Sequence, residues 1–141
     1  AMLPFCGYNM ADYFAHWLKL GDKADAAKLP QIFFVNWFRR DEDGRFLWPG
    51  YGENSRVLKW VFERVAGTVG ADETPIGLLP TVGTLDIKGL QVSTDDLTAL
   101  LSVDIEGWKS AIPQIKEHYA QFGSSLPSQL SGQLEALALA L

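Results

Sequence analysis

The turn-forming residues between positions 41 and 52 constrain this chain more than any other feature of its sequence. Residues 41–44, Asp-Glu-Asp-Gly, form a polar turn sequence with apolar runs on both sides, which predicts a β-hairpin. After the second run, Pro49 lacks an amide donor and Gly50 and Gly52 tolerate positive φ, so neither a strand nor a helix can continue. Residues 53–55, Glu-Asn-Ser, then suit the start of a helix that Gly67 ends. Its apolar positions recur on one face: Val57, Leu58, Val61, Phe62 and Val65.

The same stretch concentrates aromatic and cationic side chains. All five arginines fall between Arg39 and Arg64, and rings stand among the turn residues at Trp37, Phe38, Phe46, Trp48 and Tyr51. Rings presented from loops can sandwich a planar base, which contributes about 1–3 kcal/mol per base with little selectivity. Asn54 can supply selective hydrogen bonds, because its amide carries both donors and an acceptor. The pattern equally fits rings in an ordinary core and Asn54 as a helix cap, so both interpretations stay open.

Two blocks of the sequence resemble a known enzyme family. FFVNWFRRDEDGRFLWPGYGENSRVLKWVF, residues 33–62, is similar to the guanine-binding region of GTP-dependent phosphoenolpyruvate carboxykinase. PFCGYNMADYFAHWL, residues 4–18, resembles the same enzyme slightly upstream. The resemblance runs in register from the first residue through Pro80 and more loosely to the last helix. We therefore expect the chain to be the C-terminal portion of a longer enzyme, with any targeting signal lying upstream.

The resemblance assigns five nucleotide-binding residues. It implies that Phe38 and Tyr51 hold the base between their rings and that Asn54 hydrogen-bonds guanine. Phe46 and Trp37 would lie in the same pocket. Many family members carry phenylalanine where this chain has Tyr51, which is still expected to stack. The resemblance implies no catalytic and no metal-binding residue within this segment.

For the longer enzyme, the resemblance implies decarboxylation of oxaloacetate and phosphorylation of the enolate by GTP. The products would be phosphoenolpyruvate, GDP and CO2, and the enzyme would use Mn2+ or Mg2+. It would be a monomer that acts in gluconeogenesis in the cytoplasm. The phosphate loop, metal ligands and substrate arginines would lie upstream, and this chain has no GxxxxGK motif followed by Ser or Thr. We expect the segment alone to be inactive, because its role is to position the nucleotide for phosphoryl transfer.

Charge and hydropathy exclude several other classes of function. The net charge is −5 and the calculated pI is 4.9, whereas binding along a nucleic-acid backbone needs many cations. No apolar run approaches the roughly 20 residues that span a bilayer, so a soluble chain without a membrane partner is expected. The arginines can pair with ligand phosphates, but the sequence favours ion pairs with neighbouring acids. The residues concerned are Arg39, Arg40, Arg45 and Arg56, with Asp41, Glu42, Asp43 and Glu53 nearby.

The few metal-ligating residue types are scattered. Cys6 is the only cysteine, so an internal disulfide and a cysteine metal cluster are excluded. Beside Phe5, its thiol is expected to be buried and inert. His16 and His118 have no second His or Cys at ligand spacing, which favours packing or surface hydrogen bonds over metal binding.

The fold class expected is α/β, appearing as α+β in this segment: the C-terminal part of a mixed-sheet nucleotide-binding domain. Residues 1–67 would hold the base pocket, and residues 68–141 a loop and C-terminal helices. Residues 31–38 are predicted to form a strand that is buried on both faces and belongs to a sheet continuing upstream. Residues 67–94 are predicted to form a long loop with short extended pieces. Helices are predicted from the cap Asn9 to Gly21, from the cap Thr94 to Leu101, from the cap Asp104 to Gly123 with a bend at Pro113, and from 125–127 to the end. Three of these helices have a stripe of apolar positions. In the first they are Met10, Tyr13, Phe14, Trp17 and Leu18, in the third Ile105, Trp108, Ile112, Ile115 and Tyr119, and in the last Leu130, Leu134, Leu137 and Leu141.

Two alternatives come from other classes of function. A non-catalytic nucleotide-binding or RNA-binding module would use the same rings for stacking and would bind unrelated bases equally. An interaction domain would use Trp48, Pro49 and Tyr51 to hold a proline-rich peptide. Neither explains the resemblance in both blocks.

Overall fold

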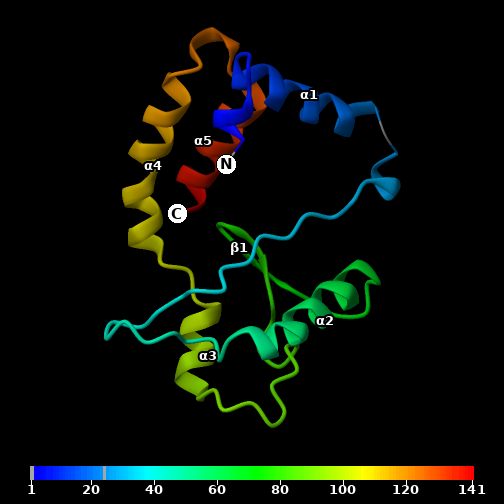
Figure 1. Ribbon diagram of the computed structural model, residues 1–141, viewed down its shortest axis with the longest axis vertical. Coiled ribbons are helices and arrows are strands. Elements are labelled where there is room, and N and C mark those ends of the chain that lie inside the picture. Colours follow the sequence, from blue (N-terminus) through cyan, green and yellow to red (C-terminus); the bar gives the residue numbers. More distant parts are fainter. Residues whose placement is uncertain (1, 24) are drawn as a thin grey trace. The chain divides into compact units, whose positions relative to one another are not determined.

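The computed structural model describes residues 2–23 and 25–141, and Figure 1 traces them by sequence colour. It combines five α-helices and one small antiparallel sheet within the described ranges, which is an α+β composition. The chain divides into two compact units, one of residues 1–30 and 104–141 and the other of residues 31–103. Each unit has its own small core. Across the described ranges, every helix is too short or too polar to span a bilayer.

The first unit is helical. It contains α1 (Met10–Lys23), α4 (Ile105–Ala120) and α5 (Ser128–Ala140), with short 3-10 helices at Leu3–Phe5, Ala26–Lys28 and Gly123–Ser125. A few apolar side chains of these helices and of the segment after α4 pack together and exclude water. Phe122 centres this core, because the rings of Phe14 and His118 meet it edge to face at 5.5 Å and 5.4 Å. The buried residues of this unit are Ala11, Ile112, Phe122 and Leu134.

The caps of these helices were mostly predictable. Asn9 accepts a hydrogen bond from the amide of Ala11, and Asp104 accepts one from Gly107, both at 2.9 Å. Gly21 was wrongly predicted to end α1, which continues to Lys23. A glycine with an ordinary helical φ costs only about 1 kcal/mol relative to alanine, so one glycine need not end a helix. Pro113 lies inside an uninterrupted α4, and its bend remains a prediction.

The second unit surrounds Trp60. It contains a 3-10 helix (Tyr51–Glu53), α2 (Asn54–Val65), strands β1 (Asp72–Thr74) and β2 (Gly77–Leu79), and α3 (Thr94–Leu101). The two strands pair antiparallel, with Glu73 opposite Leu78. The Trp60 ring meets Phe33 edge to face at 6.2 Å, and its Nε1 donates to Oγ1 of Thr84 over 3.1 Å. The buried residues of this unit are Leu47, Trp48, Trp60 and Leu97.

The ends of the helices in this unit depend on local chemistry. Gly67 has φ +70° directly after α2, as expected for the residue that ends a helix. The cap of α3 is Ser93, whose Oγ accepts from the amide of Asp96, and Thr94 is the first helical residue. The prediction of Thr94 as cap was wrong by one position, because adjacent hydroxyl residues are equivalent by type. The stretch 67–94 is a loop with the short β1–β2 pair, as predicted.

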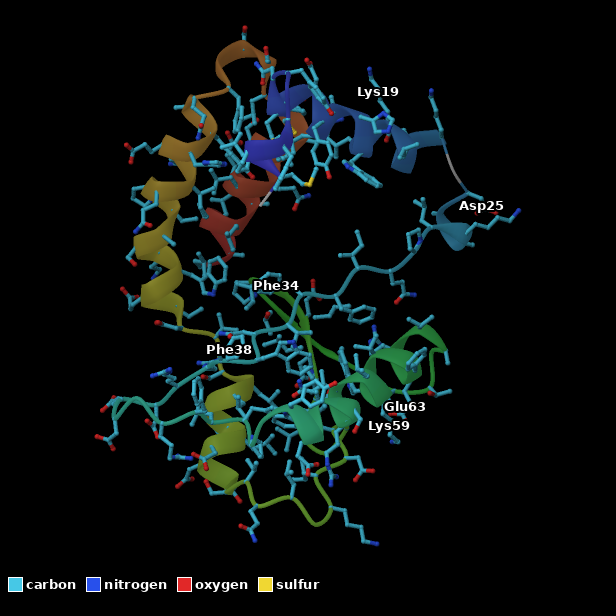
Figure 2. The ribbon with its side chains drawn as sticks, in the orientation of Figure 1. Lys19, Asp25, Phe34, Phe38, Lys59 and Glu63 are labelled. Atoms are coloured by element: carbon cyan, nitrogen blue, oxygen red, sulfur yellow. The ribbon has the colours of Figure 1, made fainter. Side chains whose placement is uncertain are left out.

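The strand predicted at residues 31–38 is absent from the described structure. This segment has no regular pairing, and Ile32 and Phe34 are 93% and 97% exposed (Figure 2 labels Phe34). Phe33 and Val35 are half-buried, so only alternate side chains pack against the unit. The prediction of burial on both faces was therefore wrong for this structure, because a strand needs hydrogen-bonding partners that no described residue supplies.

The isolated thiol and imidazoles behave almost as expected. Cys6 is half-buried rather than buried, with its Sγ 3.6 Å from Sδ of Met10, so the prediction of a buried thiol was too strong. His16 packs edge to face against Trp17, and His118 lies against Phe122. Both imidazoles are exposed, and Nδ1 of His118 also lies 2.8 Å from Nε2 of Gln121, a surface hydrogen bond.

Candidate base-binding site

The predicted hairpin is a tight turn closed by a single bridge. Within residues 41–45, the amide of Asp41 donates to the carbonyl of Arg45 over 3.0 Å, and the amide of Gly44 donates back to Asp41 over 3.1 Å. Arg40 and Phe46 form the antiparallel bridge, and Gly44 has φ +82°. A left-handed glycine after a two-residue turn is typical of short hairpins. The arrangement holds residues 38–40 beside residues 45–47.

Three of the predicted ligand rings lie on the surface of this unit. Phe38 is 72% exposed, Phe46 46% and Tyr51 93%. The rings of Phe38 and Phe46 meet edge to face with centroids 6.2 Å apart, and Figure 2 labels Phe38. Oδ1 of Asn36 accepts from the amide of Phe38 over 3.0 Å, which fixes the turn before the ring. The interpretation of these three rings as core residues is therefore wrong for this structure.

The buried part of the stretch is the Leu47–Trp48 pair, exposed by only 4% and 6%. Nε1 of Trp48 donates to Oδ1 of Asn54 over 2.9 Å. Asn54 is the first residue of α2, and its side chain forms this bond instead of a helix cap. The cap interpretation of Asn54 was thus wrong. Burial of Trp48 also removes one of the three residues of the peptide-binding surface considered above.

A glycine turn carries the chain from Trp48 to Asn54. Gly50 has φ +114°, a conformation that a side chain would strain, and the amide of Glu53 donates to its carbonyl over 3.1 Å. This turn leads into the 3-10 helix that bears Tyr51. The sequence Pro-Gly-Tyr-Gly therefore places Tyr51 three residues before the half-buried Asn54. Trp37, the fifth predicted residue, is half-buried beside the exposed Phe38.

Two arginines form the ion pairs that the sequence favoured. Arg45 lies 2.9 Å from Asp41 and 2.6 Å from Asp96, and hydrogen bonding to Asp96 raises the pKa of Arg45 above its usual range. Arg56 pairs with Glu53 at 2.5 Å, and its Nη1 donates to the carbonyl of Asp86 over 2.7 Å. Both guanidinium groups are thus engaged by acids of this unit.

The other two arginines make contacts that the sequence did not indicate. Arg39 donates from Nη1 to the carbonyls of Leu100 (3.3 Å) and Ser102 (2.8 Å), and from Nη2 to Oγ of Ser102 over 3.0 Å. Arg40 places its Cζ 4.2 Å from the centroid of Phe46, a cation–π contact. Ion pairing was wrongly predicted for both among the described residues. Arg39 instead binds the carbonyls that a helix leaves unpaired at its C-terminal end.

These contacts fasten the ring-bearing hairpin to both ends of α3. Arg45 bonds Asp96 in the first turn of the helix, and Arg39 bonds its C-terminal end (Figure 1 shows α3 beside the hairpin segment). The partners are 51 and 63 residues apart in the sequence. Asp96 and Ser102 are thus supporting residues that sequence reasoning missed, because no local pattern links an acid on a short helix to a distant turn.

One hollow of the second unit is not lined by any of these rings. It measures about 270 Å³ and is largely apolar, and none of its lining residues belongs to the predicted base-binding set. It lies between the β1–β2 pair and α3. Its lining residues are Asp72, Thr74, Leu79, Pro80, Val82, Thr98, Leu101 and Ser102. The candidate site is therefore defined by exposed rings and an oriented amide rather than by a deep cavity.

Comparison with known proteins agrees with the resemblance. The family model of the phosphoenolpyruvate carboxykinase C-terminal P-loop domain matches residues 1–140. A protein of Treponema pallidum (strain Nichols), named phosphoenolpyruvate carboxykinase (GTP), is 60% identical over 138 residues, covering 97% of this chain and 22% of that protein. Proteins of the same name from Neocallimastix frontalis and Renibacterium salmoninarum are 59% and 52% identical over 97% of this chain.

The chain spans less than a quarter of each of these relatives, 22% to 23% of their length. The matched region contains both sequence blocks and all of the candidate site. A family match over residues 1–140, together with identities of 52–60%, is far beyond what shared fold class alone produces. The chain therefore belongs to the GTP-dependent phosphoenolpyruvate carboxykinase family and corresponds to the C-terminal domain of its members.

Proposed function

We propose that this chain is the guanine-nucleotide-binding part of a longer GTP-dependent phosphoenolpyruvate carboxykinase. That enzyme would convert oxaloacetate and GTP into phosphoenolpyruvate, GDP and CO2 in gluconeogenesis. The observation that carries the proposal is that Phe38, Phe46 and Tyr51 expose their rings in the same unit in which Trp48 holds the amide of Asn54, in a member of this family. Phe38 and Tyr51 would stack on the base, Phe46 and Trp37 would support them, and Asn54 would read the guanine edge.

The geometry supports a positional role for this segment. Exposed aromatic faces bind any base through stacking, and selectivity has to come from hydrogen bonds. Binding energy gained at the base would hold the γ-phosphoryl group in line with the enolate oxygen that attacks it. The P–O bond to the β-phosphate breaks as the new P–O bond forms, and GDP leaves.

The remaining machinery is proposed to lie elsewhere in the longer enzyme. Relatives carry the name of a GTP-dependent enzyme, so GTP or GDP is the proposed co-substrate. The enzyme would use Mn2+ or Mg2+, but residues 2–23 and 25–141 hold no group of three His, Cys, Asp or Glu suited to a metal ion. No step proposed for this chain therefore uses a metal. We also propose that the enzyme is monomeric and cytoplasmic and that upstream strands complete a mixed sheet. This segment alone is proposed to be inactive.

Calorimetric titration with GDP and with ADP tests the proposal. The enzyme of full length should prefer GDP, whereas residues 1–141 alone should bind weakly because the phosphate contacts are missing. Replacing Asn54 with alanine in that enzyme should weaken GTP use and leave any ATP use nearly unchanged. Equal losses for both nucleotides would remove the guanine-reading role of Asn54. Equal binding of unrelated bases by the unchanged protein would instead favour a stacking module for nucleotides or RNA.

A further inference from the structure

The hydrogen bond from Trp48 determines which way the amide of Asn54 faces. Nε1 of Trp48 lies 2.9 Å from Oδ1 of Asn54. An indole nitrogen can only donate, and of the two amide groups only the oxygen can accept. Turning the amide over would set its NH2 against the indole N–H and leave the N–H of a ring that is only 6% exposed without an acceptor. Trp48 therefore sets the orientation of Asn54.

This orientation determines what Asn54 can offer a ligand. Among the described residues, no hydrogen bond uses Nδ2 of Asn54, so its two N–H groups remain available beside the second lone pair of Oδ1. A donor next to an acceptor in this order matches a carbonyl next to a ring N–H, the 6-oxo edge of guanine and hypoxanthine. Adenine presents the reverse order, a 6-amino donor next to a ring nitrogen acceptor. For a base held in the same pose, only an overturned amide would match it.

We propose that Trp48 is a specificity-determining positioning residue, which selects 6-oxopurine over 6-aminopurine nucleotides by holding the amide of Asn54 in one orientation. The inference rests on the proposed function, because it requires a purine at Asn54. Trp48 does not touch the base. It acts by making the adenine-reading orientation of the amide unfavourable.

The first test replaces Trp48 with phenylalanine in the full-length enzyme. The substitution keeps an apolar ring and removes the N–H that prevents the amide from turning over. Steady-state kcat/KM should be measured with GTP, ITP and ATP. We expect the preference for GTP over ATP to fall about 5- to 10-fold, the effect of one hydrogen bond near the base. The GTP/ITP ratio should not change, because both nucleotides present the same 6-oxo edge.

A second variant removes the N–H with less change of shape. Replacing Trp48 with β-(3-benzothienyl)alanine substitutes sulfur for the N–H and keeps both fused rings. It should lower the GTP/ATP preference in the same way while leaving the melting temperature near that of the unchanged enzyme. This variant decides the outcome if Trp48→Phe does not fold.

Trp60→Phe is a matched control in the same unit. Trp60 is 5% exposed, and its Nε1 donates to Thr84 over 3.1 Å, so the same chemical change is made at another buried indole. This variant should be less stable and should keep the GTP/ATP preference. An unchanged preference in both Trp48 variants, with discrimination in the unchanged enzyme, overturns the role of Trp48. Absence of GTP/ATP discrimination in the unchanged enzyme overturns the proposed function itself.

Discussion

Nη2 of Arg45 lies 2.6 Å from Oδ1 of Asp96, and this contact joins the turn of the ring-bearing hairpin to the first turn of α3. Arg39 makes the corresponding connection at the other end of the helix, on the carbonyl of Ser102. The hairpin contains one antiparallel bridge, between Arg40 and Phe46. Side-chain contacts with α3 hold it where no neighbouring strand of the described residues does. The position of the Phe38 ring therefore depends on residues far from it in sequence.

The first prediction concerns Asp96. Replacing it with asparagine in the full-length enzyme should raise the KM for GTP about two- to fivefold and leave kcat nearly unchanged, because an exposed ion pair is weak but orients the hairpin. Asp95→Asn is the matched control, since it removes the same charge from the same helical turn and Asp95 makes no ion pair among the described residues. Steady-state kinetics that show equal effects of the two changes would contradict a positioning role of Asp96.

The second prediction concerns pH. Hydrogen bonding from Arg45 lowers the pKa of Asp96 below its ordinary value of 3.8, and the bonds to Ser93 act in the same direction. A carboxyl whose pKa is lowered by folding stabilises the protein above its unfolded-state pKa, and this contribution is lost as the pH falls through the folded value. The melting temperatures of the unchanged protein and of Asp96→Asn should differ by a constant amount above about pH 5 and converge below pH 3.8. A difference that persists at lower pH would show that the Asp96 charge does not contribute.

The third prediction concerns stacking. Phe38→Ala in the full-length enzyme should weaken nucleotide binding by about 1–3 kcal/mol, or roughly 5- to 150-fold, because the base loses one of the two rings proposed to stack on it, a ring that is 72% exposed in this chain. The affinity for Mn2+, followed by its paramagnetic resonance signal, should hardly change. A primary loss of metal affinity would show that Phe38 acts elsewhere.

The fourth prediction concerns stability. Trp60→Ala should destabilise the second unit by about 3–5 kcal/mol, because it leaves a cavity beneath Phe33 and removes the donor to Thr84. Phe62 on the same helix is 74% exposed, so Phe62→Ala should cost much less in this chain. Urea unfolding of both variants measures the difference. Similar losses would indicate that Phe62, not only Trp60, is buried in solution.

Local features of the fold could be predicted from sequence because each depends on a few consecutive residues. The turn at 41–44, the caps Asn9 and Asp104, and the end of α2 at Gly67 all follow from backbone preferences and short-range hydrogen bonds. Within the candidate site, the sequence also showed that rings and an amide lie at and beside turns. Their identity as nucleotide ligands came from the family resemblance and stays a prediction.

The strand expected at 31–38 could not be predicted correctly from local sequence. The run Ile-Phe-Phe-Val has strong strand preference, but a strand forms only when another backbone pairs with it. In the described structure, Phe33 packs on Trp60 while Phe34 is 97% exposed. Apolar composition alone cannot distinguish a strand from an unpaired segment with one buried face.

By itself, the sequence determined where this protein turns, which segments are helical, and to which family it belongs, because these depend on local preferences and on residue identity. Only the tertiary structure decided that Trp48 is buried while Phe38 and Tyr51 are exposed. The same holds for the choice of Asp96 as the partner of Arg45, and for the bond of Asn54 to Trp48 instead of to the helix. Such outcomes depend on which surfaces meet in space. Before folding, two aromatic, two acidic or two amide residues have the same chemistry, so residue type alone cannot tell which of them is buried or paired.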